Sequence, residues 1–263
     1  MTLVTTATEV VKLFTAAPNA RRRFIKWSSD PKRAHVVNHV MAHRTDAVYR
    51  LTPHDMERVL VQDSHALGEV VGARAKKVGN IEKWFPDFAF SHVFHYIVET
   101  MGTCPTWEEA RRFWRSDDTA RGMLLTPALK EVEAAVLQGY EKAVANEAMR
   151  WRIGNFYYSF LREVYTLVML RSAGVDARVH PLADALFRAD IWSKRTVVSI
   201  YVRNPDYRDG EEGRKHPVEE ILAGARPPFS FHTIALPGAR RRAKPHLPND
   251  RQIRTAIETL RDG

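Results

Sequence analysis

The spacing of the apolar residues changes near residue 150, and this change limits the folds that the chain can adopt. Before it, apolar residues recur every three or four positions, as on the buried face of a helix. After it come short β-branched and aromatic runs typical of buried strands, of which 196–202 (TVVSIYV) is the clearest. The pattern predicts an α+β protein with a helical domain at 1–150, an α/β domain at 151–237 and a basic C-terminal extension with a short helix at 238–263.

Helix starts in the first part are marked by a proline after a small polar residue. Proline suits the first helical turn, and the polar side chain caps it. Such pairs predict one helix from Asp30-Pro31, one from Thr52-Pro53 to about Gly79, and one from Thr126-Pro127 through 151. Thr106 and Glu109 have the spacing of a capping box.

The second part is interpreted as one helix followed by short strands. The apolar segment 155–172 predicts a helix that ends at Gly174, since glycine is a good C-terminal stop. The further elements expected are strands at 177–181, 185–192, 196–202 and 229–236, a helix at 214–223 before the last strand, and a helix at 251–261.

Charge and cysteine content narrow the function classes. Forty Lys and Arg against 31 Asp and Glu give a net charge of +9, which favours a polyanionic partner such as nucleic acid. A single cysteine, Cys104, excludes an internal disulfide and a multi-cysteine zinc site, and it favours the reducing cytoplasm. No apolar run approaches the ~18 residues of a membrane span, so no membrane association is expected.

Two acids stand out in the second part. Glu163 lies in the helical segment that precedes the first expected strand, and Asp190 lies between Ala189 and Ile191 in an apolar strand. With this order of elements, residues 155–236 resemble the PD-(D/E)XK nuclease superfamily, also called the restriction-endonuclease-like fold. The resemblance implies a small mixed sheet flanked by helices, with Glu163 and Asp190 as ligands of Mg²⁺ or Mn²⁺.

The implied chemistry is metal-dependent cleavage of a phosphodiester. A divalent cation shields the phosphate and holds the attacking water, and a nearby lysine stabilises the developing charge. The third strand departs from the family pattern, because Ser199 and Tyr201 occupy the positions of the usual acid and lysine.

The missing groups have candidate replacements elsewhere. Lys194 precedes the third strand, and Lys215 and Glu219 lie four residues apart on one face of the following helix. Asp184 is a further acid near the second strand. The set of candidate catalytic residues is therefore Glu163, Asp190, Lys194, Lys215 and Glu219; the alternative is an inactive site.

Both acids also have a structural interpretation. Glu163 borders the apolar stripe of its helix and has Arg162 and Arg171 as candidate salt-bridge partners. A carboxylate in an apolar strand costs free energy unless it is paired or liganded. Arg188, two residues from Asp190, is its candidate partner.

Three basic clusters predict contacts with phosphates, because Lys and Arg dominate binding to nucleic-acid backbones. The clusters are Arg21, Arg22, Arg23 and Lys26; Arg111, Arg112 and Arg115; and Arg240, Arg241, Arg242 and Lys244. Each is alternatively an ordinary solvated face.

The histidines are not expected to bind metal. His35, His39 and His43 recur every four residues, and three ligands along one straight helix cannot reach one ion. A solvated or nucleic-acid-facing stripe is expected there. His92 and His95 lie among aromatic residues and are expected in a core or an interface.

The main hypothesis is a DNA-binding protein with a nuclease-like domain that cleaves phosphodiesters in defence, transposition or repair. The alternative is a catalytically inactive nuclease-like subunit that binds nucleic acid and scaffolds a larger assembly, which the missing acid and lysine favour. An RNA-directed protein is a third hypothesis. A duplex cutter with one site per chain is expected to form a homodimer or to work within a larger complex.

Overall fold

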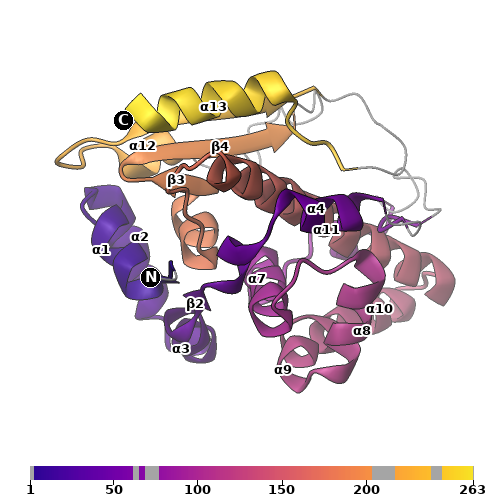
Figure 1. Ribbon diagram of the computed structural model, residues 1–263. Coiled ribbons are helices and arrows are strands. Elements are labelled where there is room, and N and C mark those ends of the chain that lie inside the picture. Colours follow the sequence, from indigo (N-terminus) through magenta and orange to yellow (C-terminus); the bar gives the residue numbers. More distant parts are fainter. Residues whose placement is uncertain (1–2, 62–64, 69–76, 203–216, 238–244, 263) are drawn as a thin grey trace.

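The computed structural model describes residues 3–61, 65–68, 77–202, 217–237 and 245–262. Its composition is α+β, as expected, with one two-stranded and one three-stranded sheet among the described residues (Figure 1). No helix within these ranges is both long and apolar enough to cross a membrane.

Short helices dominate the N-terminal part, together with a two-stranded antiparallel sheet. The α-helices are α1 (Ala7–Phe14), α2 (Pro18–Ser28), α3 (Ala34–Ala42), α4 (Pro53–Leu60), α6 (Gly79–Glu82), α7 (Phe90–Met101), α8 (Trp107–Ser116), α9 (Asp118–Ala120) and α10 (Thr126–Leu137). The remaining elements are β1 (Thr5–Thr6), β2 (Arg44–Thr45), the 3₁₀ turns η1 (Pro31–Arg33) and η2 (Ala47–Arg50), and the π-helical turn η3 (Arg121–Leu125).

Two of the predicted long helices are wrong. The helix expected from Thr52 to Gly79 ends at Leu60, and residues 66–68 form a turn instead. The helix expected from Thr126 through 151 ends at Leu137, because Gly139 adopts the left-handed region at φ +94°. The predicted capping box of Thr106 and Glu109 is confirmed at the start of α8.

The longest helix, α11 (Lys142–Ser172), runs through residue 150 without a break. Its N-terminal half packs closely on the turn at 66–68, where a Cβ on Gly154 would lie 2.8 Å from the Ala66 carbonyl oxygen. The helix stops at Gly174, as predicted, and the φ of Gly174 is +81°. The N–H of Val175 donates to the Leu170 carbonyl, and that of Gly174 donates to the Arg171 carbonyl, which is the Schellman pattern.

A three-stranded mixed sheet follows α11. β3 (Ile191–Ser193) pairs antiparallel with β4 (Thr196–Val202), and β4 pairs parallel with β5 (Ser230–Leu236) in the order β3-β4-β5. The strand predicted at 196–202 is confirmed, and the last strand begins one residue later than predicted. α12 (Val218–Leu222) lies between β4 and β5 in the chain, and the predicted helix residues 214–216 lie outside the described ranges.

Two predicted strands differ from the structure. Residues 183–187 form the π-helical turn η4 (Ala183–Phe187), so the strand predicted at 185–192 shortens to β3. The strand predicted at 177–181 is reduced to a single bridge between Arg178 and Trp192. The apolar side chains in these segments pack by tertiary contact, which does not require the extended backbone that their composition favours.

The N-terminal helices and the sheet share one hydrophobic core. Phe14 of α1 stacks on Phe187 and Phe229 and contacts Trp192 edge-on. In Figure 1, α1 and α2 lie below the sheet, and α13 (Asp250–Asp262) runs above it. The C-terminal helix predicted at 251–261 is therefore present and packs against β5 and α11.

Candidate metal centre

Three carboxylates converge where α11, η4 and β3 meet. Glu163 comes from α11, Asp184 from η4, and Asp190 from the residue before β3. One oxygen of each lies within 4.8 Å of the other two, and all three residues are half-buried. The arrangement offers three oxygen ligands to one cation, and oxygen is the donor that Mg²⁺ and Mn²⁺ prefer.

The geometry of η4 brings Asp184 into this group. The turn begins after His180, whose ring nitrogen Nδ1 accepts the N–H of Leu182. It ends at Arg188, which adopts the left-handed region at φ 61° and donates its N–H to the Asp184 carbonyl. The chain reverses there and enters β3, so that Asp184 and Asp190 lie six positions apart yet share one site.

The Asp190 carboxylate is held by the backbone of the neighbouring strand. Its Oδ2 accepts a 2.7 Å hydrogen bond from the N–H of Ile200 in β4. This hydrogen bond fixes the direction in which the carboxylate points.

A half-buried cation, Arg162, lies beside the acids. Burial lowers the pKa of the Arg162 guanidinium, while the negative charges of Glu163 and Asp190 raise it. The Arg162 Nε donates to the carbonyl of His246 at 2.9 Å, which links α11 to the segment before α13. Arg171, by contrast, lies near Asp176 and donates to the Ala177 carbonyl.

The structure brings together only part of the set of candidate catalytic residues. Glu163 and Asp190 share the site, whereas Lys194 lies in the β3–β4 turn, at the opposite end of the hairpin from Asp190. At about 3.3 Å per strand residue, the four positions between Asp190 and Lys194 correspond to about 13 Å. Lys194 is therefore not placed to replace the missing lysine, and it lines a separate surface pocket with Asp176 and other residues.

Of the two remaining candidates, only Glu219 lies within the described residues. Glu219 is exposed on α12 and is not one of the three clustered acids. Lys215 lies outside the described residues. Asp184, noted in the sequence only as an acid near the second strand, is the third carboxylate of the group.

Strand β4 carries hydroxyl groups where the resemblance implies an acid and a lysine. Ile191 pairs with Val198, so the same register continued by one residue sets Ser199 opposite Asp190. Residues directly opposite in an antiparallel pair share a face of the sheet. Ser199 is half-buried, and Tyr201, on the same face, is 48% exposed.

One basic cluster lies on a helix that contacts η4, the turn that carries Asp184. Helix α2 packs against η4, and the Arg23 Nε donates to the Leu186 carbonyl at 3.1 Å. Arg21, Arg22 and Lys26 are exposed on the same helix. The cluster at 111–115 lies on α8, and the residues 240–244 that carry the third lie outside the described ranges.

The expectation of a solvated histidine stripe is wrong for two of its three members. His35 is exposed, but His39 is half-buried and His43 is buried against His92 and His180, because this face of α3 packs on α7. His92 and His95 are buried in the core, as predicted. Unlike the three acids, the histidine nitrogens form no comparable three-ligand group among the described residues.

Comparisons with known proteins found no relative of this chain. No protein-family model matches the chain, and neither a curated protein nor a solved structure matches it. Any function of the carboxylate group therefore has to be argued from its own geometry.

Proposed function

We propose that this chain binds nucleic acid and cleaves phosphodiester bonds with a divalent metal held by Glu163, Asp184 and Asp190. The observation that carries the proposal is the approach of these three carboxylates to within 4.8 Å of one another. The donor set fits Mg²⁺ or Mn²⁺, since it consists of half-buried carboxylate oxygens with no sulfur or nitrogen ligand among the three.

The order of elements supports a restriction-endonuclease-like arrangement of this core. A helix carrying Glu163 precedes an antiparallel β3–β4 pair, and a connection through α12 returns the chain to β5, parallel to β4. Asp190 comes directly before β3, which corresponds to the second strand of that arrangement. Glu163 lies on the helix where the resemblance expects the glutamate, and Asp190 lies one residue before the strand on which it expects the aspartate.

The metal and the groups around it have separate proposed roles. A bound divalent cation would shield the phosphate and lower the pKa of a coordinated water. The Ile200 N–H orients the Asp190 carboxylate. The positive charge of Arg162 offsets part of the negative charge of Glu163 and Asp190. The exposed Arg21, Arg22 and Lys26 on α2 are the groups proposed to contact the backbone of the nucleic acid.

The test is a cleavage assay with supercoiled DNA and Mg²⁺ or Mn²⁺. We expect nicking that Asp190→Asn and Asp184→Asn each reduce at least a hundredfold. The matched control is Asp118→Asn, which changes an acid on α9 whose side chain is 92% exposed and should leave cleavage unchanged. Cleavage that survives both substitutions in the carboxylate group would overturn the proposal.

The second candidate is a non-catalytic nucleic-acid-binding subunit. The observation in its favour is the pair Ser199 and Tyr201 on β4, which supply neither a carboxylate nor a cation. Salt-sensitive DNA binding without cleavage in either metal would support this candidate. Preferential binding of single-stranded RNA in competition would redirect either candidate from DNA to RNA.

A further inference from the structure

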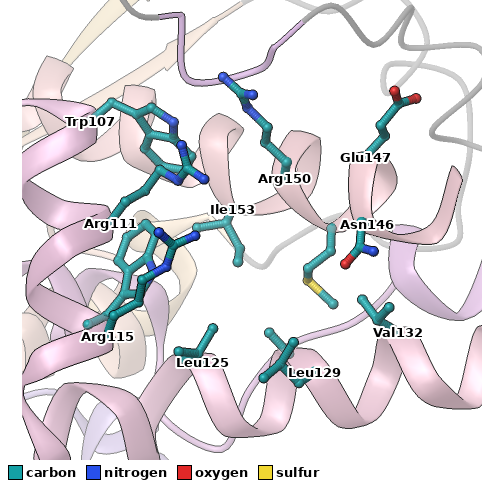
Figure 2. Close-up of a pocket in the computed structure, with 13 residues that line it drawn as sticks. Trp107, Arg111, Arg115, Leu125, Leu129, Val132, Asn146, Glu147, Arg150 and Ile153 are labelled. Carbon is teal, nitrogen blue, oxygen red and sulfur yellow. The ribbon is translucent and has the colours of Figure 1, made fainter. Parts of the chain in front are cut away.

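A cavity of about 380 Å³ lies between α8, α10 and α11, apart from the carboxylate centre (Figure 2). Its volume is in the range of small-molecule sites in proteins. Most of its lining is apolar and comes from α10 with the preceding turn and from α11; the aliphatic members are Leu125, Ala128, Leu129, Val132, Met149 and Ile153.

Three arginines line the same cavity. Arg111 and Arg115 project from α8 and Arg150 from α11, whereas Glu147 is the one acid in the lining (Figure 2). Arg111 is paired with Glu108 outside the cavity at 3.1 Å. Arg150 is held in place by donating to the carbonyls of His65, at 2.8 Å, and Ala66. The exposed Arg115 adds a third positive charge on the α8 side of the cavity (Figure 2).

We infer that this cavity binds an organic anion with an aliphatic body and a carboxylate headgroup. Burial of an apolar chain against the aliphatic wall favours binding by the hydrophobic effect. A guanidinium can bind a carboxylate through two parallel hydrogen bonds. The charges in the lining indicate that the ligand is negatively charged, since three arginines and only one glutamate line the cavity.

The lining disfavours a nucleotide base as the occupant. A base would need an exposed aromatic face on which to stack. Trp107 and Trp114 border the cavity, but they are only 1% and 5% exposed and pack edge-on against each other. The accessible wall is therefore aliphatic, which suits a flexible chain better than a flat ring.

The test uses octanoate as the probe, below its micelle-forming concentration, with tryptophan fluorescence and calorimetry as readouts. We expect saturable binding that the neutral analogue octanol does not reproduce. Arg115→Ala should weaken octanoate binding at least tenfold. Arg112→Ala is the matched control, because Arg112 is exposed on the same helix and does not line the cavity.

A second pair of variants tests the aliphatic wall without disturbing the core. Leu129→Glu places a negative charge at the cavity, at a leucine that is 48% exposed, and should abolish octanoate binding. Leu137→Glu makes the same change at the end of α10, at a leucine that is 90% exposed and outside the lining, and should leave binding intact.

Three results would overturn the inference: no saturable octanoate binding, equal effects of the Arg112 and Arg115 variants, or preferential binding of adenosine monophosphate. The inference is independent of the proposed nuclease function, because none of the three acids lines this cavity. Either one can fail while the other stands.

Discussion

His39 Nδ1 lies 3.0 Å from His92 Nε2, so two imidazole rings from α3 and α7 share one hydrogen bond in the protein interior. The neighbouring rings of His43 and His180 are 5.2 Å apart between centroids. The His43 Nε2 and His92 Nδ1 atoms are buried with no hydrogen-bond partner among the described residues. Such a cluster is stable only while its rings are neutral, because a buried, unpaired imidazolium is costly.

This cluster predicts loss of stability in acid. Burial lowers the pKa of His95 to about 3 and that of His180 to about 4, below the ordinary value of 6.5. A depressed pKa means that the unfolded chain takes up protons first, so stability is complete above pH ~6.5 and falls as the pH drops toward the folded-state values. For His95 alone the loss at pH 4.5 is about 2–3 kcal/mol.

Urea unfolding at pH 7.5 and at pH 4.5 measures this effect. His95→Leu should flatten the pH dependence, because the buried ionisable ring is removed. His35→Leu, at the exposed member of the α3 histidines, should leave it as in the parent chain. Identical pH profiles for the His95 variant and the parent would contradict the assignment.

Removal of one acid from the carboxylate group should have opposite effects with and without metal. Three carboxylates within 4.8 Å repel one another, so Asp184→Asn is expected to raise the metal-free melting temperature by a few degrees. Added Mn²⁺ at a hundred times its Kd should stabilise the parent by about 2.7 kcal/mol and the variant much less. Thermal melts with chelator and with Mn²⁺ test both signs, and a variant that responds to Mn²⁺ like the parent would argue against a shared site.

On the proposed function, installing on β4 the acid and lysine that the resemblance implies should raise cleavage. Ser199→Glu with Tyr201→Lys places an acid and a cation on the same face of the sheet as Asp190. We expect at least a tenfold increase in the single-turnover nicking rate, because a single charged or proton-transferring group in an active site typically changes the reaction rate by tenfold or more. The same pair combined with Asp190→Asn is the control and should stay inactive.

The close approach of α11 to the turn at 66–68 predicts an intolerant glycine. Gly154→Ala would set a methyl group 2.8 Å from the Ala66 carbonyl oxygen. This oxygen belongs to the backbone and cannot easily move away. The expected loss is about 1–3 kcal/mol in the free energy of unfolding. Gly122→Ala is the control: nothing lies within 4 Å of its added Cβ, and its expected change is within about 1 kcal/mol in the stabilising direction. Equal urea midpoints for the two variants would refute the packing argument.

Local sequence signals determined the elements whose causes lie within a few residues. The strand 196–202 follows from its β-branched run, and the end of α11 follows from Gly174, which adopts the left-handed conformation that a Schellman cap requires. The capping box of Thr106 and Glu109 is local in the same sense. The change in apolar spacing likewise predicted the α+β class, and the single cysteine excluded an internal disulfide, because neither depends on which surfaces meet.

The tertiary structure alone decided which side chains share a site. Asp184 joins Glu163 and Asp190 because residues 183–187 wind into a π-helical turn, although the apolar run at 185–192 favoured a strand. His180 and His43 meet only because α3 packs against α7 and the segment after α11, a contact between residues 137 positions apart. Burial and proximity depend on how whole faces pack, and the free energy of that packing exceeds the local preference of any single segment.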